Sequence, residues 1–229
     1  MRKTKVKKYD LKKIRNKLAG IFRSSKEFVD SASYWEERYR SGGGSGRGSY
    51  NELAEFKARI INKFIKEHAI GDVIEHGCGD GNQLGYMKYS SYLGFDISTE
   101  AIAICRNKFK SDPTKSFATN SEYAGEKAEL SLSLDVIYHL VEDEVFESYM
   151  DRLFSSSNSY VIIYSSNFDD TPSGKQGHVR NRKFTDYVKR KLPDWEMIEH
   201  IPNEYPPSED GKVGSSADFF IYRRKNQTN

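Results

Sequence analysis

The chain has 229 residues and a formal net charge of +3, a length that suits one domain with its own hydrophobic core. No apolar run reaches the roughly 18 residues of a membrane-spanning helix, and no apolar signal segment follows the basic N-terminus. The cysteines, Cys78 and Cys105, suit a reduced protein better than a disulfide framework, so we expect a cytoplasmic location.

Residues 1–29 form a basic tail. They hold eleven Lys or Arg against two acids, a balance of +9 that leaves −6 for residues 30–229. Apolar residues recur at helical spacing between the cations, at Leu11, Ile14, Leu18, Ile21 and Phe22. We expect the tail to contact an anionic membrane surface or an acidic partner, with a solvated helix or disorder as the alternative. The acidic remainder argues against a nucleic-acid groove, so no nucleic-acid partner is expected.

Residues 30–49 join an aromatic cluster to a glycine-rich stretch. The cluster, 33–40, contains one Trp and two Tyr, and residues 41–49 include five glycines. Two interpretations stay open, a flexible linker between tail and domain and a lid over a bound ligand. A helix with an apolar core stripe is expected next, over 50–69, with Asn51 as its N-cap.

A glycine-rich turn follows the first predicted strand, which ends near Ile74. After Glu75, glycine stands at every second position, at Gly77, Gly79 and Gly81. Such a turn lets the backbone approach a ligand without Cβ clashes, and its free amides form a polar cradle. Asp96 lies 17 positions after Gly79, at the end of a second apolar run. A carboxylate there can accept both hydroxyls of a ribose.

This pairing of an acid and a glycine turn with a second acid resembles the S-adenosylmethionine (SAM) site of class I methyltransferases. A nicotinamide dinucleotide site is the first alternative, but its fingerprint is G-x-G-x-x-G. Here the third glycine comes one residue early, and Asn82 holds the dinucleotide position. A dinucleotide also needs a helix N-terminus for its pyrophosphate, whereas SAM has no phosphate. A turn without a ligand is the second alternative.

Helices and strands alternate through the rest of the chain. We expect a short helix over 82–88, a helix that is capped by Ser98 or Thr99 and ends at 109, and a strand over 116–119. A strand ending at 134 should follow, and then a helix that leads to a strand over 160–164. The last expected elements are a helix over 184–192 and an antiparallel pair of strands over 195–201 and 217–222. The inward residues expected of the two middle helices are Ile102, Ile104, Val145, Tyr149, Leu153 and Phe154.

This alternation predicts an α/β fold, a three-layer Rossmann-like arrangement. It should contain a seven-stranded, mostly parallel sheet with an antiparallel C-terminal strand pair and helices on both faces. Ligands of such sheets bind outside the carboxyl ends of the strands. The domain is expected to span 50–229, and the resemblance covers about 33–222.

The stretch 129–140 strengthens the resemblance, because its last eight residues are similar to the fourth-strand motif of SAM-dependent methyltransferases, small-x-Asp-Val-x-x-His-Leu. Tyr138 stands where many relatives carry Glu. The resemblance implies that the segment 30–49 folds over the cofactor. It also implies cofactor contacts from Trp35, Tyr39, Glu75, His76, Gly77, Cys78, Gly79, Asp96, Ile97, Asn120, Leu134 and Asp135.

We therefore expect an enzyme, a SAM-dependent methyltransferase acting on a hydroxyl or amine of a small acceptor. Cations in the loop 168–183 suggest an anionic acceptor, although a solvated basic loop is the alternative. The overall pattern resembles methyltransferases that modify sugars and polysaccharides, which implies carbohydrate modification and a sugar or glycan-precursor acceptor. Acceptor contacts are expected from Tyr138, Asn167, His178, Arg180 and Arg182.

His139 is the first candidate for the base that takes the acceptor's proton, and His178 is the second. A histidine that only packs is the alternative for His139. No metal is expected, because Asp135 is joined only by the scattered acids Asp169 and Asp170. A SAM-binding module without catalysis, acting as a scaffold or regulator, is the alternative function. The oligomeric state is not readable from the sequence.

Overall fold

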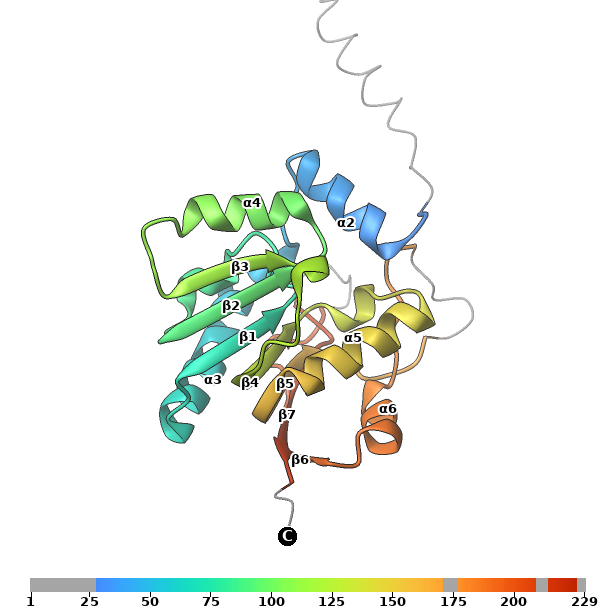
Figure 1. Ribbon diagram of the computed structural model, residues 1–229. Helices are drawn as coiled ribbons and strands as arrows, with labels where there is room; N and C mark the ends of the chain where they lie inside the picture. Colours follow the sequence, from blue (N-terminus) through green and yellow to red (C-terminus); the bar gives the residue numbers. More distant parts are fainter. Residues whose placement is uncertain (1–27, 171–176, 209–213, 226–229) are drawn as a thin grey trace, which may run out of the picture.

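The structure is a computed structural model that describes residues 28–170, 177–208 and 214–225. The predicted basic tail therefore lies outside the described residues except for its last two. Within the described ranges, seven strands form one sheet (Figure 1). They are β1 Asp72–His76, β2 Ser91–Asp96, β3 Lys115–Thr119, β4 Ala128–Leu134, β5 Ser157–Ser165, β6 Trp195–Ile201 and β7 Asp218–Arg224.

The strand order is β3-β2-β1-β4-β5-β7-β6, with β1 to β5 parallel and β7 antiparallel to both of its neighbours. The predicted fold class, including the antiparallel C-terminal pair, is confirmed. The order reverses between β1 and β4, and ligands of open α/β sheets bind at such a switch point. The glycine turn after β1 therefore emerges at the centre of the sheet's carboxyl edge.

Helices pack on both faces of the sheet. The α-helices are α2 Ser31–Arg40, α3 Asn51–His68, α4 Thr99–Lys108, α5 Asp143–Ser155 and α6 Phe184–Lys191. Single 3-10 turns are η1 Arg47–Ser49, η2 Gln83–Tyr86, η3 Asn120–Glu122 and η4 Ile137–His139. No helix among the described residues is long and apolar enough to cross a bilayer.

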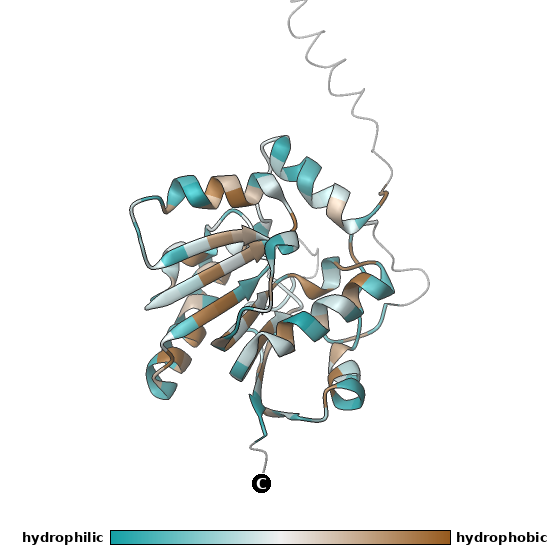
Figure 2. Ribbon diagram, in the orientation of Figure 1, coloured by the Kyte–Doolittle hydropathy of each residue, from teal (hydrophilic) through white to brown (hydrophobic). Residues whose placement is uncertain are grey.

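The strand β5 shows how the two faces divide. Ile162 and Tyr164 join the apolar cluster of α3 and α4, whereas Val161 and Ile163 join that of α5 and α6. Successive side chains of a strand point to opposite faces, so a strand covered on both sides is apolar throughout. Figure 2 shows this pattern, with brown residues along the central strands and mainly hydrophilic colouring on α2.

Three local predictions are wrong. The N-cap of α3 is Tyr50, and Asn51 is the first helical residue with a φ of 50°. Ile104 is 38% exposed and Val145 is 44% exposed, so neither faces the core. The Ser98 cap starts α4 at Thr99, which turns Ala101, Ile102 and Cys105 inward. In α5 the inward set is Phe146, Tyr149, Met150, Leu153 and Phe154, an i, i+3, i+4, i+7, i+8 pattern.

Candidate active site

The glycine turn after β1 adopts a conformation that only glycine takes without strain. Gly77, Gly79 and Gly81 have φ values of 83°, 57° and 67°. A Cβ on Gly77 would overlap the Val136 side chain, and one on Gly79 would overlap the Ser45 hydroxyl. The turn is therefore pressed between the segment after β4 and the glycine-rich segment 41–49.

Asp96 ends β2 and is bonded to this turn. Gly79 N–H donates to Asp96 Oδ2 over 2.9 Å, and Ser98 N–H donates to Oδ1 over 2.9 Å. The carboxyl group is buried, and burial raises the pKa of Asp96 to about 6. Each oxygen of the carboxylate keeps a free lone pair for a ligand hydroxyl.

Glu75 and His76 are neighbours in β1, but their side chains point to opposite faces of the sheet. Glu75 is buried below the turn and accepts a 2.6 Å hydrogen bond from the Tyr92 hydroxyl, while burial raises the pKa of Glu75 to about 7. The His76 ring lies in the core, with Nε2 2.9 Å from Ser156 Oγ. Burial lowers the pKa of His76 to about 3. His76 does not line the cavity described next, so its placement does not support the predicted cofactor contact.

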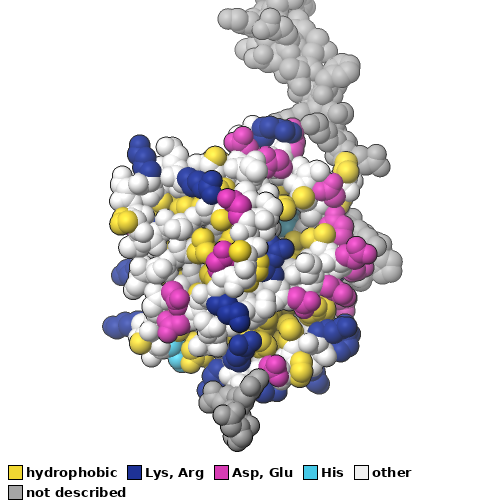
Figure 3. Space-filling view, in the orientation of Figure 1, with side chains coloured by type: hydrophobic (Ala, Val, Ile, Leu, Met, Phe, Trp, Pro, Cys, Tyr) yellow, Lys and Arg dark blue, Asp and Glu magenta, His cyan; other side chains and the backbone are white. Residues whose placement is uncertain are grey.

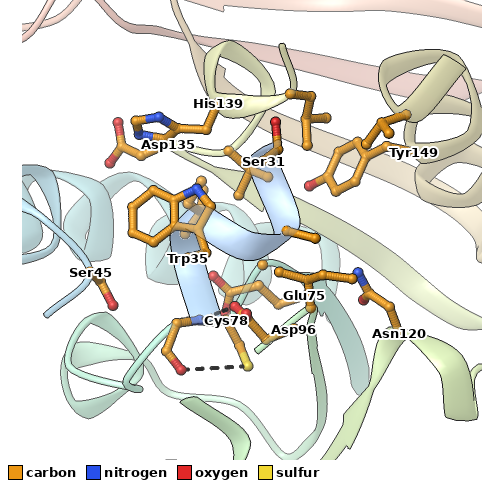
Figure 4. A pocket seen from close by; sticks show the side chains of 18 of the residues that line it. Ser31, Trp35, Ser45, Glu75, Cys78, Asp96, Asn120, Asp135, His139 and Tyr149 are labelled. Atoms are coloured by element: carbon orange, nitrogen blue, oxygen red, sulfur yellow. Dashed lines mark hydrogen bonds between the residues drawn. The ribbon is translucent and has the colours of Figure 1, made fainter. Parts of the chain in front are cut away.

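A cavity of about 590 Å³ lies beneath α2 at the carboxyl edge of the sheet (Figure 4). Ile97 contributes an apolar wall and is 46% exposed. Every predicted cofactor residue except His76 lines this cavity, namely Trp35, Tyr39, Glu75, Gly77, Cys78, Gly79, Asp96, Ile97, Asn120, Leu134 and Asp135. Residues from the ends of three parallel strands and from α2 therefore share one cavity.

The helix α2 lies across the cavity and is fastened at both sides. At its start, Ser31 Oγ donates to Glu142 Oε2 over 2.6 Å, and near its middle Glu36 Oε1 accepts from Thr99 Oγ1 over 2.7 Å. The glycine-rich segment after α2 is joined to the glycine turn, because Asp80 N–H donates to Ser45 Oγ over 2.9 Å. Residues 30–49 therefore pack against the cavity and the glycine turn, and their role as a lid over the cofactor stays a prediction.

His139, in η4, lines the cavity, and its ring centroid lies 4.8 Å from that of Trp35. Its Nδ1 lies 3.1 Å from the backbone carbonyl oxygen of His178. A carbonyl only accepts, so Nδ1 carries the proton and Nε2 keeps its lone pair. Burial lowers the pKa of His139 to about 4, so the ring is neutral at pH 7. His178 does not line the cavity; its ring stacks on Tyr34 at a centroid distance of 4.2 Å.

The wall next to His139 contains a buried ion pair. Lys57, on α3, is fully buried, and its Nζ lies 2.5 Å from Asp135 Oδ2. The Tyr138 hydroxyl donates to Asp135 Oδ1 over 2.8 Å, and Asp135 has a φ of 60°. Lys57 is not among the site residues predicted from the sequence. The available signal was a charged residue within the apolar stripe of the helix 50–69, since a buried lysine requires a partner.

The other predicted acceptor residues lie away from the cavity. Arg182 donates to the backbone carbonyl oxygens of Leu140 and Val141, and both Arg180 and Arg182 pair with Asp143. Asn167 Oδ1 accepts from Thr185 N–H over 3.2 Å at the start of α6. Their polar groups hold loops together, so their placement does not support an acceptor contact.

Comparison with known proteins agrees with this geometry. Residues 74–160, which contain the glycine turn, Asp96 and the fourth-strand motif, match the family model described as Methyltransferase domain. No curated protein matches the chain. This match and the shared fold support the predicted enzyme class, a SAM-dependent methyltransferase, and SAM as its cofactor.

The solved structures that share the fold include the following three. The N-methyltransferase NodS from Bradyrhizobium japonicum WM9, in complex with S-adenosyl-L-homocysteine, has a TM-score of 0.66 and 14% identity, covering 86% of this chain and 99% of that one. Magnesium protoporphyrin IX methyltransferase (ChlM) from Synechocystis PCC 6803, with bound SAM, has a TM-score of 0.62 and 15% identity, covering 86% of this chain and 98% of that one. The methyltransferase domain of bacterial CtHen1-C has a TM-score of 0.58 and 15% identity, covering 76% of this chain and 100% of that one.

Proposed function

We propose that the protein transfers the methyl group of SAM to a hydroxyl or amine of a small acceptor inside the cavity beneath α2. The observation that carries this proposal is the hydrogen bond from Gly79 to Asp96 in the cavity wall. In this arrangement Asp96 would accept the ribose hydroxyls, Ile97 and Asn120 would contact the adenine, and the glycine turn would contact the amino-acid end.

The charge of the cavity suits a cationic cofactor. Its described lining contains two permanent cations, Lys57 and Arg152. The acids are more numerous, namely Asp30, Glu75, Asp80, Asp96, Asp135, Glu142 and Glu144. In Figure 3, Asp and Glu side chains gather on the right-hand rim near α5, while Lys and Arg cluster over α6. A sulfonium is attracted to such a site by Coulomb interaction.

The charges that line the cavity also limit which acceptor it favours. Arg180 and Arg182, on which an anionic acceptor was predicted, are paired with Asp143 outside the cavity. An acidic lining favours a neutral or cationic acceptor instead. We therefore propose a neutral hydroxyl acceptor, such as a sugar or glycan precursor, with a small amine as the alternative. The lid formed by α2 favours a molecule, or the end of one, that is small enough to be enclosed.

We assign the base role to His139. A hydroxyl acceptor loses a proton as its oxygen attacks the methyl carbon and the sulfur leaves as a neutral thioether. Nε2 of His139 takes that proton, while Nδ1–H stays bonded to the carbonyl of His178. A pKa near 4 makes this a weak base, so most of the rate must come from alignment of the sulfonium and the acceptor, an effect worth about 7–11 kcal/mol at best.

Calorimetry with SAM, S-adenosylhomocysteine and NADH tests the cofactor. Binding of the first two without the third is expected, and binding of NADH alone would refute the proposal. A screen of nucleotide sugars, glycans and small amines, read by release of S-adenosylhomocysteine, tests the acceptor. Turnover with a hydroxyl acceptor is expected. Cofactor binding with no turnover across all three acceptor classes would favour the non-catalytic module.

A further inference from the structure

The amino-acid end of SAM carries a carboxylate and an ammonium group, and both need partners inside a closed cavity. Figure 4 shows Asn120 and Tyr149 at one end of the cavity and Asp135 and Ser45 at the opposite end. With the nucleoside at Asp96 and Asn120, the amino-acid end extends toward Asp135.

Lys57 is the cation at that end. Of the two permanent cations in the described lining, Arg152 lies over the ring of Tyr123 at 5.7 Å, just beyond η3 and therefore at the Asn120 end. Lys57 is held beside Asp135. An ammonium group has three donors, and Asp135 is the hydrogen-bond acceptor that the structure gives it. Two donors are left for a ligand carboxylate.

Gln83, in η2, supplies the complementary acceptor. The residue is 6% exposed and lines the cavity, and its Nε2 donates to the carbonyl oxygen of Ala54 over 2.8 Å. Its Oε1 is buried without a hydrogen-bond partner among the described residues. A buried unsatisfied acceptor costs free energy unless a ligand donor meets it. Ala54 and Lys57 are three residues apart on α3, so Gln83 contacts this helix about one turn from Lys57.

We propose that Lys57 and Gln83 form the subsite for the α-amino acid group of the cofactor. Lys57 Nζ donates to the carboxylate, and Gln83 Oε1 accepts from the ammonium group. Asp135 and Tyr138 hold Lys57 in place. This inference rests on the proposed cofactor. It assigns to these two residues the discrimination between the full cofactor and nucleosides that lack the amino-acid group.

The test is calorimetry of the full chain with S-adenosylhomocysteine and with 5′-methylthioadenosine, which has no amino-acid group. Wild type is expected to bind S-adenosylhomocysteine at least tenfold more tightly. Lys57→Met should weaken S-adenosylhomocysteine about tenfold or more and change 5′-methylthioadenosine by less than about twofold. Gln83→Met should act in the same direction, and Lys57→Arg should restore part of the loss. Asp96→Asn is the matched control, because it should weaken both ligands equally.

The outcomes separate the two proposals. If wild type binds neither ligand, the proposed cofactor is wrong. If it binds both with equal affinity, or if Lys57→Met weakens both alike or neither, the subsite is wrong and the cofactor stands. Thermal melts show whether Lys57→Met is folded. If it is not, the wild-type ratio and Gln83→Met decide, and an unchanged ratio in Gln83→Met overturns the assignment.

Discussion

The backbone amide of Gly79 donates a hydrogen bond to Asp96 Oδ2 over 2.9 Å, which joins the turn after β1 to the end of β2. One carboxylate thus fixes the turn and faces the cavity. Asp96→Asn keeps an acceptor for Gly79 but removes the charge. We expect it to weaken the binding of S-adenosylhomocysteine by about 1.5–3 kcal/mol, the range for hydrogen bonds to charged groups. Calorimetry measures this, and equal affinity would remove Asp96 from the site.

Cofactor affinity should depend on pH through the same group. Burial raises the pKa of Asp96 to about 6, and the ionised form is the one that accepts two ribose hydroxyls. Protons therefore compete with the ligand below about pH 6. Affinity for S-adenosylhomocysteine should be level from pH 7.5 to 8.5 and should fall between pH 7 and 5. Since Glu75 titrates nearby, Asp96→Asn is the reference, and an unchanged pH profile in that variant would contradict the assignment.

Glu75→Gln should stabilise the fold in alkaline solution. Burial raises the pKa of Glu75 from 4.5 to about 7, so the native state holds this proton more tightly than the unfolded state does. Ionisation of the buried Glu75 carboxyl destabilises the native state. This effect is absent below about pH 4.5, grows as pH rises, and is complete above about pH 7, at most on the order of 3 kcal/mol. Gln keeps an acceptor for the Tyr92 hydroxyl.

Denaturant unfolding of wild type and Glu75→Gln at pH 5 and pH 8 measures this difference. The variant should gain stability over wild type at pH 8 and much less at pH 5. A gain that is the same at both pH values would show that Glu75 does not titrate as its burial implies.

His139→Gln should reduce turnover by about 10²–10⁴-fold, the usual contribution of a general base. The dissociation constant for S-adenosylhomocysteine should change little. His178→Gln is the matched control, because His139 contacts the backbone carbonyl of His178, which this substitution keeps. Because burial lowers the pKa of His139 to about 4, it adds no break near pH 6.5 to the pH–rate profile. Full turnover in His139→Gln would mean that a group other than His139 takes the proton of the hydroxyl acceptor.

The basic segment 1–29 remains a predicted membrane contact. Its net charge of +9 should bind vesicles containing anionic lipid, with weaker binding at high salt. A chain lacking residues 1–29 should lose vesicle co-sedimentation and keep its affinity for S-adenosylhomocysteine. Co-sedimentation that survives the deletion would place the contact elsewhere.

The sequence was sufficient for the architecture and for the part of the cavity near the ends of β1, β2 and β4. Alternating apolar strands and helices define the order of elements, and the glycine pattern marks a turn that needs positive φ. Because the carboxyl ends of parallel strands share one edge, Glu75, Asp96 and Asp135 could be placed in one site from their positions alone.

A shift of one residue along a strand or helix changes the direction of a side chain, and the sequence did not fix that direction for three residues. His76 follows Glu75 directly, so it points to the opposite face of β1 and into the core. Val145 and Ile104 sit one position away from inward-facing residues of their helices. Hydrophobicity alone does not set the rotation of a short helix, because its cap and first turn do so.

The sequence by itself determined the strand and helix alternation, the left-handed turn and the acids near the ends of β1, β2 and β4, since these depend on neighbouring residues. Only the tertiary structure decided which distant charges meet. Lys57 and Asp135 are 78 positions apart, and Arg182 and Asp143 are 39 apart. No local pattern encodes such pairs. A buried charge must find a partner, and the packing of distant helices and strands determines which partner is within reach.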